Sequence, residues 1–195
     1  MKKYIFALTA IVLAFILESC SAPTYVTSWV DPNFKGKQVK KVMVIALVKD
    51  VDYRRAYENN LTYELAKENI TAISSLAILN FQKKYSNEEI GEILQNGNYD
   101  GLITIKYLET DIKKRIRPAV TFVDYYWGGV SVFSRPGYVE KHKIVKMEVS
   151  LFSPKSKTPI WYATTKTRDA TDINDLASSI ADEITSNLKE NGFVK

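Results

Sequence analysis

The chain has 195 residues, of which 25% are charged and 46% hydrophobic, and its formal net charge is +5. A chain of this length supports one domain that buries roughly 70% of the surface its unfolded form would expose, which excludes a miniature fold that depends on disulfides. A small positive charge mixed along the chain is typical of a solvated surface, and it lacks the basic footprint of a nucleic-acid-binding protein.

The first twenty residues resemble a bacterial lipoprotein signal. Two lysines precede an apolar run from Tyr4 to Leu17, which is shorter than the ~20 residues that a membrane-spanning helix needs. Leu17 lies three positions before Cys20, the only cysteine of the chain. We therefore expect cleavage after residue 19 and fatty acylation of Cys20, for example by palmitate. Cleavage removes two of 27 basic and one of 22 acidic residues, leaving a net charge of +4.

This resemblance also implies a location. Residues 21–24 lack the aspartate that retains some lipoproteins in the inner membrane, so we expect a lipid anchor in the outer membrane that faces the periplasm. The alternative is a free thiol behind an ordinary signal peptide, which would leave an unpaired cysteine open to oxidation. The expected organisation is a signal peptide (1–19), a lipidated tether (20–26) and a single domain (27–195).

The first half of the domain alternates strand and helix patterns. The unbroken apolar run from Val42 to Val48 predicts a strand covered on both faces. The pattern Ser86-x-x-Glu89 predicts a capping box, and Gly97 is expected to end the helix that follows in the left-handed conformation. The segments expected here are extended chain at 24–30, a strand at 42–48, a helix at 52–69, a strand at 70–74, a helix from 87 and a strand at 101–109.

The second half predicts an antiparallel pair and a closing helix. Apolar residues alternate over 143–152, and a turn leads to a second strand over 160–167. Thr171 or Asp172 is expected to cap the last helix and Gly192 to end it. The fold class expected is mixed α/β (α+β): a central mixed sheet with a parallel βαβαβ core, an added antiparallel hairpin and a C-terminal helix.

Four short motifs are spread along the chain. They are Thr27-Ser28-Trp29-Val30-Asp31-Pro32 after the cysteine, the strand Lys40–Ala46, Asp100 before the third strand and the late pair Ile160-Trp161. Together they resemble the motifs of small envelope lipoproteins of unknown function. More distantly, the order of elements is similar to periplasmic modules of curli-secretion lipoproteins and of lipoprotein activators of cell-wall synthases. Fold-level similarity of this kind carries little functional weight.

The inventory of reactive residues does not indicate an enzyme. His142 is the only histidine and lies between two lysines, so neither a metal site nor a cofactor is expected. The chain contains no Gly-x-Ser-x-Gly, phosphate-loop or His-Glu-x-x-His motif. A hydrolase with dispersed residues is kept as the weakest alternative.

The segment 118–138 is unusual because aromatic residues crowd it. Gly128-Gly129 between two β-rich runs predicts a two-residue hairpin turn. Apolar residues occupy both faces of the expected strands, whereas a hairpin in water keeps one face polar. Either the hairpin folds back over its own domain, as most aromatic clusters are core, or it presents a binding surface. The candidate partner-binding residues are Phe122, Tyr125, Tyr126, Trp127, Phe133 and Tyr138.

A basic run precedes this hairpin. It comprises Lys113, Lys114, Arg115 and Arg117. Such a run could meet phospholipid head groups or an acidic cell-wall polymer, or it could simply keep a sheet edge soluble. The function expected is a non-catalytic, lipid-anchored accessory protein that binds an envelope protein in the periplasm. The alternative is a module that binds glycan or peptidoglycan through the same aromatic and basic residues.

Overall fold

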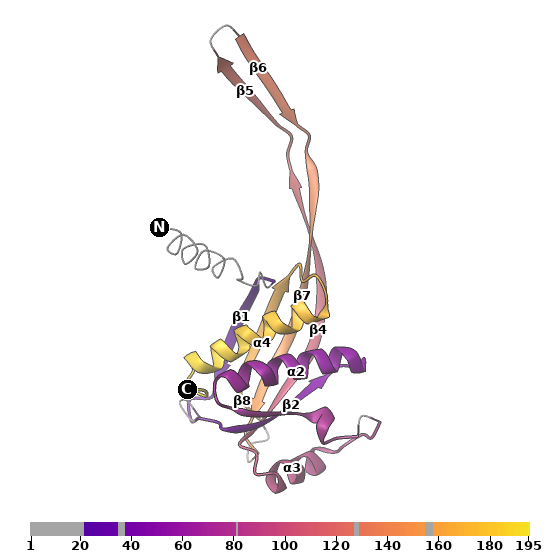
Figure 1. The fold of residues 1–195 in the computed structure, drawn as a ribbon, viewed down its shortest axis with the longest axis vertical. Helices are drawn as coiled ribbons and strands as arrows, with labels where there is room; N and C mark the ends of the chain where they lie inside the picture. Colours follow the sequence, from indigo (N-terminus) through magenta and orange to yellow (C-terminus); the bar gives the residue numbers. More distant parts are fainter. Residues whose placement is uncertain (1–21, 35–37, 81, 127–128, 155–157) are drawn as a thin grey trace, which may run out of the picture.

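The computed structural model describes residues 22–34, 38–80, 82–126, 129–154 and 158–195. Six strands form one mixed sheet in the order β1-β8-β7-β4-β2-β3, and β5 and β6 form a separate antiparallel pair (Figure 1). The expected fold class is thereby confirmed. The elements are β1 Thr24–Val30, β2 Lys41–Leu47, α2 Val51–Lys67, β3 Thr71–Ser74, η2 Ser75–Ala77, α3 Asn87–Asn96, β4 Gly101–Arg117, β5 Val120–Tyr126, β6 Gly129–Arg135, β7 Tyr138–Phe152, β8 Pro159–Arg168 and α4 Ile173–Glu190.

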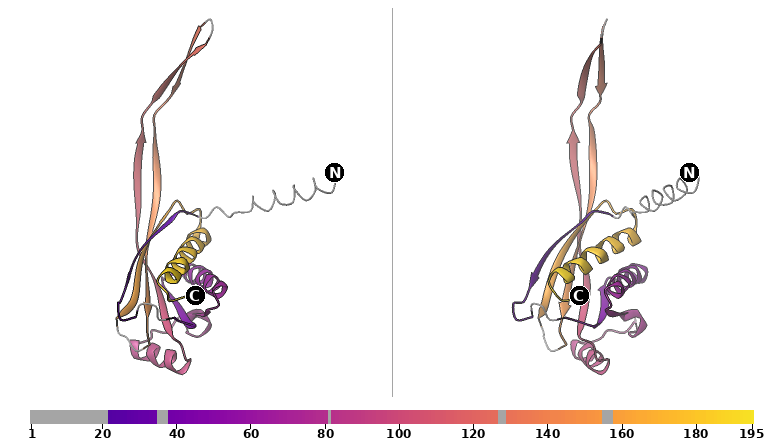
Figure 2. Two further views of the ribbon diagram at one scale, coloured as in Figure 1. Left: turned by 90° about the vertical axis from the view of Figure 1, so that its left-hand side faces the viewer. Right: turned by 60° about the vertical axis from the view of Figure 1, so that its left-hand side comes forward.

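The sheet has a parallel half and an antiparallel half. Strand β2 pairs in parallel with β3 and β4, which confirms the expected βαβαβ core. Strands β4, β7, β8 and β1 then pair antiparallel in succession. Helices α2 and α4 lie side by side on one face of the sheet, here called the α2/α4 face, and α3 lies at the end far from β5 and β6 (Figure 2).

Strand β2 has apolar neighbours on both faces, as its unbroken run predicts. Val44 and Ala46 belong to the large core beneath α2 and α4. Met43 and Ile45 point the other way, into a smaller core with residues of α3. Alternate side chains of a strand point to opposite faces, so a run without polar alternation fits only a strand in the middle of the layers.

Helices α3 and α4 begin with the caps that the sequence indicates. The Asp172 side chain accepts hydrogen bonds from the backbone N–H groups of Asn174 and Asp175, and Gly192 has a φ of 77° just beyond α4. The apolar stripe of α4 is buried against the sheet, and the expected capping box of Ser86 and Glu89 is present at the start of α3. Helix α2 ends at Lys67, two residues earlier than expected.

One detail of the α3 terminus differs from the expectation. Gly97 has a φ of −82°, and the left-handed residue is Asn98, with a φ of 51°. A side chain on Gly97 would overlap the ring of Tyr99. Glycine is therefore required at this position for space, not for its backbone conformation.

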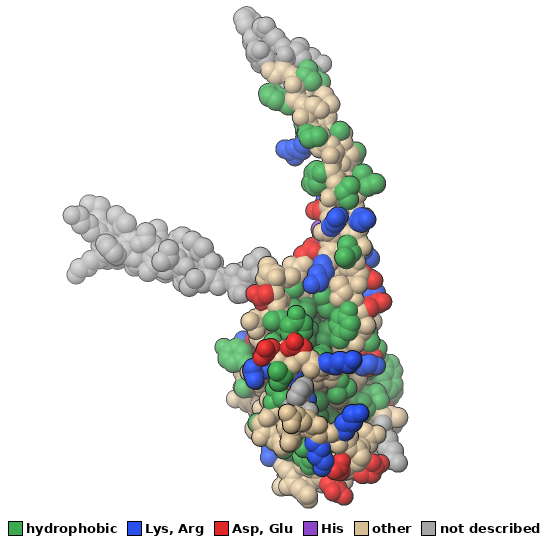
Figure 3. All heavy atoms as spheres, turned by 90° about the vertical axis from the view of Figure 1, so that its right-hand side faces the viewer, with side chains coloured by type: hydrophobic (Ala, Val, Ile, Leu, Met, Phe, Trp, Pro, Cys, Tyr) green, Lys and Arg blue, Asp and Glu red, His purple; other side chains and the backbone are tan. Residues whose placement is uncertain are grey.

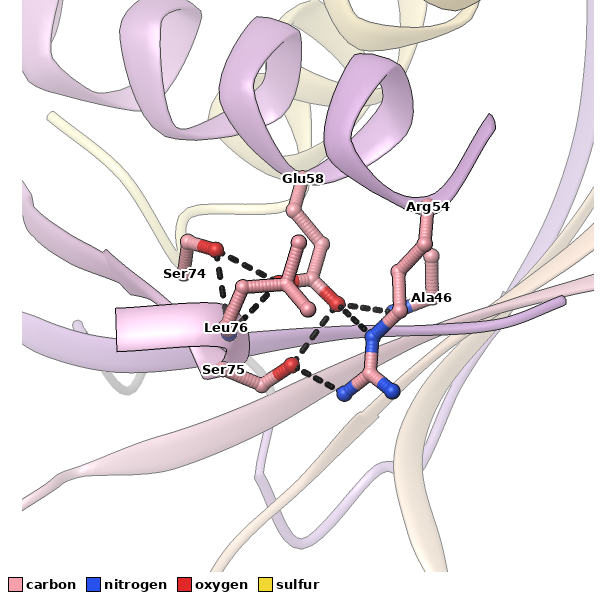
Figure 4. A network of polar contacts seen from close by, with 6 residues as sticks. All are labelled: Ala46, Arg54, Glu58, Ser74, Ser75 and Leu76. Carbon is pink, nitrogen blue, oxygen red and sulfur yellow. Dashed lines mark hydrogen bonds and ion pairs between the residues drawn. The ribbon is translucent and has the colours of Figure 1, made fainter. Parts of the chain in front are cut away.

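A buried carboxylate joins α2 to the parallel half of the sheet (Figure 4). Glu58 is fully buried, and its Oε1 accepts hydrogen bonds from the Ala46 amide at 2.9 Å and from Arg54 Nε at 2.8 Å. The hydroxyls of Ser74 and Ser75 donate to the same carboxylate at 2.6 and 2.7 Å. Buried charges are tolerated when they are paired and hydrogen-bonded, and this group satisfies both conditions.

We expect Glu58→Ala to lower the free energy of unfolding by about 3–5 kcal/mol, because the change breaks the ion pair with Arg54 and leaves the buried donors of Ala46 and Ser75 without their acceptor. Urea unfolding followed by circular dichroism measures this loss. Asp52→Ala is the control in the same helix, since its side chain is 77% exposed in an ion pair with Arg55; it should cost about 1 kcal/mol or less. Equal effects of the two substitutions would contradict the role given to Glu58.

Candidate functional site

The most distinctive feature of the molecule is a long two-stranded arm. Strand β4 does not end near Glu109, as the sequence suggested, but runs on to Arg117 while paired with β7. Strands β5 and β6 continue outward from there, and the resulting ribbon stands away from the domain (Figures 1 and 2). We call residues 109–126 and 129–146 the arm. Its two stretches of β4 and β5 amount to roughly 50 Å of extended chain.

The arm decides between the two alternatives for the aromatic hairpin, because its described apolar side chains are exposed and do not cover the domain (Figure 1). Phe122 and Phe133 lie opposite one another in β5 and β6 and are 53% and 62% exposed. Val123 and Val132 form the next pair, on the other face of the ribbon, and both are exposed. Exposed apolar side chains on both faces are uncommon in a soluble protein and mark interaction surfaces.

The remaining candidate aromatic residues are dispersed. Tyr138 is exposed at the start of β7, opposite Arg117. Tyr125 pairs with Val130 and Tyr126 with Gly129, so Gly129 already belongs to β6. Trp127, Gly128 and Cys20 lie outside the described residues.

A β-bulge at the base of the arm reverses which side chains face the helices. Tyr107 pairs with Met147, but the register shifts before Glu109, which pairs with Lys146. Opposed residues of an antiparallel pair share a face, and one extra residue moves every later side chain to the other face. From the bulge outward, the residues of β4 on the α2/α4 face are Thr110, Ile112, Lys114 and Ile116, and their partners in β7 are Val145, Lys143, Lys141 and Val139.

Strand alternation divides the basic run of the sequence between two faces, and the bulge decides which residues face the helices. Lys114 lies on the α2/α4 face, whereas Lys113, Arg115 and Arg117 lie on the opposite face. Arg117 forms an ion pair with Glu140 on that face, with 3.0 Å between Nε and Oε2. The four residues do not make a single basic surface.

The base of the arm is held by His142 and Asp169. The two side chains hydrogen-bond at 2.6 Å, between Nδ1 and Oδ2, and the backbone amide of Lys143 donates to Asp169 Oδ1 at 2.8 Å. These two bonds, that of His142 foremost, lower the pKa of Asp169. The only histidine is thus part of a structural clamp between β7 and the loop that leads to α4.

A groove of about 820 Å³ lies at the base of the arm on the α2/α4 face, and no motif of the sequence pointed to it. It opens beyond the carboxyl end of β2, beside β4 and between the first turns of α2 and α4; Figure 3 shows hydrophobic side chains gathered at the base of the arm. Ligands of open α/β sheets commonly bind at carboxyl ends of strands. The residues that line the groove are Leu47, Val48, Lys49, Asp50, Tyr53, Tyr57, Tyr107, Thr110, Lys143, Val145, Ala170, Thr171, Asp172, Ile173 and Leu176.

The groove suits binding better than acid–base chemistry. The hydroxyl of Tyr57 is buried and donates only to the weak acceptor Met147 Sδ, at 3.9 Å. Burial, with smaller contributions from Tyr53 and Tyr107, raises the pKa of Tyr57 to about 12. Asp50 and Asp172 already cap the two helices. Across the described residues, no group of three or more His, Cys, Asp and Glu side chains could hold a metal ion.

The short motifs that resemble envelope lipoproteins have structural roles. Asp100 accepts hydrogen bonds from the backbone amides of Lys40 and Lys41 at 2.8 and 2.9 Å and so aligns the starts of β2 and β4. Asp31 accepts from the amide of Asn33 in the turn after β1. Trp161 is fully buried beneath α4.

Together these elements define an α+β domain that carries a projecting β-hairpin arm. No protein-family model matches the chain, and none of the curated proteins compared with it matches it in sequence. The fold is similar to that of PelC from Paraburkholderia phytofirmans, solved as a dodecamer, with a TM-score of 0.50 and 12% identity over 85% of this chain and 97% of PelC. A variant of that dodecamer gives a TM-score of 0.50 and 13% identity over 85% and 98% of the two chains.

The lipoprotein GNA1162 from Neisseria meningitidis gives a TM-score of 0.42 and 8% identity over 77% of this chain and 99% of that one. At such identities a match shows the fold alone. The described helices include none that is long and apolar enough to cross a membrane.

We expect Asp169→Asn to reduce the loss of stability in acid. The pKa of Asp169 is lower in the folded protein than the ~3.9 of an unfolded chain, so its contribution is complete above that value and is lost as pH falls through the folded pKa. Asparagine tolerates the φ of 56° at this position. Urea midpoints between pH 6 and pH 2.5 should fall less steeply in the variant, and parallel curves would refute the clamp.

Proposed function

We propose that this protein is a non-catalytic, lipid-anchored accessory protein of the bacterial envelope that binds a protein partner through β5 and β6. The location is supported by the leader, in which an apolar run precedes the only cysteine of the chain. The role as a binding protein is supported by one observation above all: large apolar side chains are exposed on both faces of β5 and β6, which we call the outer arm.

The limited stability of a two-stranded hairpin makes this exposure a reason to expect a partner. An isolated two-stranded hairpin is at best marginally stable in water. Within the part of the chain that the structure describes, neither β5 nor β6 pairs with a third strand. A partner that covers Phe122 and Phe133 would bury apolar area and supply the packing that the ribbon lacks.

The partner that the fold suggests first is a second copy of this chain, because PelC, which has a similar fold, assembles as a dodecamer. Another envelope protein would use the same surface. Mass spectrometry of crosslinked material distinguishes the two directly.

We expect Phe122→Ala/Phe133→Ala to abolish crosslinking of the partner in intact envelopes. Loss of a central aromatic pair costs at least about 2 kcal/mol of binding energy, which corresponds to roughly 30-fold in affinity. The matched control is Thr121→Ala/Ser134→Ala, the neighbouring pair on the other face of the ribbon. It should leave crosslinking intact. Equal recovery from both variants, at equal abundance, would reject the outer arm as the contact surface.

The groove favours a second candidate function, binding of a glycan or peptidoglycan strand. The rings of Tyr53 and Tyr107 are half-exposed in the groove, where a sugar ring could stack on them. Polar groups at the rim of the groove could hydrogen-bond the sugar hydroxyls. Tyr53→Ala/Tyr107→Ala should then release the protein from purified cell wall, while the variant of the two phenylalanines should not. If both variants stayed bound to the cell wall, or if both were released from it, glycan binding by the groove would be rejected.

A further inference from the structure

The inner part of the arm has two faces of different character. On the α2/α4 face, three consecutive pairs run outward from the edge of the groove: Ile112 with Lys143, which lines the groove, Lys114 with Lys141, and Ile116 with Val139. These six residues contain three lysines and no acidic side chain. We call them the lysine–isoleucine face.

The opposite face of the inner arm mixes basic with acidic side chains. Its basic residues are Lys113, Arg115, Arg117 and Lys146, and its acidic residues are Glu109, Asp111 and Glu140. Lys146 contacts Glu109 at 2.5 Å and Asp111 at 2.8 Å. Arg117 pairs with Glu140. Among the described residues, by contrast, the structure gives no ion-pair partner to Lys114, Lys141 or Lys143. The lysine–isoleucine face therefore carries three lysines and no acidic side chain, whereas on the opposite face four basic side chains are largely offset by three acidic ones.

The same face also exposes apolar side chains between its lysines. Ile112, Ile116 and Val139 are 68%, 77% and 54% exposed. A soluble polyanion would be recognised by the lysines alone and gives branched apolar side chains nothing to contact. An anionic lipid surface offers both, because head groups attract lysines while the acyl boundary accepts apolar side chains.

The position of the N-terminal segment points to the same surface. The Ala22 amide donates to Asp175 in the first turn of α4 at 3.1 Å, so the chain enters the domain on the α2/α4 face. Asp175 also accepts from Thr171, which lines the groove at the base of the arm. Cys20 precedes Ala22 by two residues, a reach of at most ~7 Å. An acylated Cys20 would thus hold the membrane on the side of the lysine–isoleucine face.

We propose that the lysine–isoleucine face docks on an anionic lipid surface and forms a second membrane contact beside the acyl anchor. The inference shares the envelope location of the proposed function but does not depend on its protein partner. Because the anchor keeps the lipid close, even a weak contact is populated through a high effective concentration. The contact would fix the orientation in which the outer arm meets its partner.

The test uses the purified acylated protein reconstituted into vesicles that contain phosphatidylglycerol. Acylation consumes the thiol of Cys20, so Ile116→Cys and Arg115→Cys each introduce one free thiol, on opposite faces of the ribbon. A polarity-sensitive fluorophore on residue 116 should shift to the blue and be quenched by lipid-borne quenchers, and one on residue 115 should not. The shift should disappear in vesicles of phosphatidylcholine alone or at high salt.

A charge-matched pair of variants tests specificity, with the fluorophore on residue 116 throughout. Lys114→Gln/Lys141→Gln/Lys143→Gln should weaken the contact about 100-fold, because each lysine near an anionic surface contributes roughly fivefold. Lys106→Gln/Lys113→Gln/Lys166→Gln removes the same charge from the opposite face and should change the contact less than about threefold.

Three results would overturn the inference. The first is equal quenching at residues 115 and 116, and the second is equal loss in the two triple variants. The third is a shift at residue 116 that requires acidic cell-wall polymer and is absent with vesicles. Phe122→Ala/Phe133→Ala should leave the lipid contact unchanged, which separates this proposal from the protein-binding one.

Discussion

The structure depends on the antiparallel ladder between β4 and β7. Its inner pairs, such as Ile105 with Val149, form the centre of the sheet and are buried beneath α2 and α4. Its outer pairs continue beyond the last contact with the helices and become the arm. One ladder thus forms part of the core and also the inner part of the arm that projects from it. Apolar burial at the inner end stabilises the register of the exposed outer end.

Side-chain contacts at the junction between the domain and the arm hold the arm in place. The bond between His142 and Asp169 ties β7 to the loop before α4, and Lys146 links β7 to two carboxylates of β4. Each bond is exposed and contributes modestly. Their common position, where the sheet loses its helix cover, is what makes them useful. Farther out, the described residues of the ribbon have only their own cross-strand pairs.

The arm consequently carries separate surfaces along its length. The groove and the lysine–isoleucine face lie near the domain and near the entry of the N-terminal segment, whereas Phe122 and Phe133 lie far out. In the proposed arrangement, lipid contacts orient the arm and the outer hairpin meets a protein. Similarity to PelC extends over most of both chains but at 12% identity establishes the fold alone.

The sequence by itself determined the local helices and strands and which of their faces are buried. The unbroken run of β2, the capping box at Ser86 and the buried stripe of α4 all follow from periodicity and capping chemistry, which depend on near neighbours. Only the tertiary structure decided which side chains share a face of the arm. By simple alternation from Ile105, Lys113 and Arg115 would face the helices, yet the bulge after Tyr107 places Lys114 there instead. Register and bulges are set by partners distant in sequence, so no local pattern reveals them.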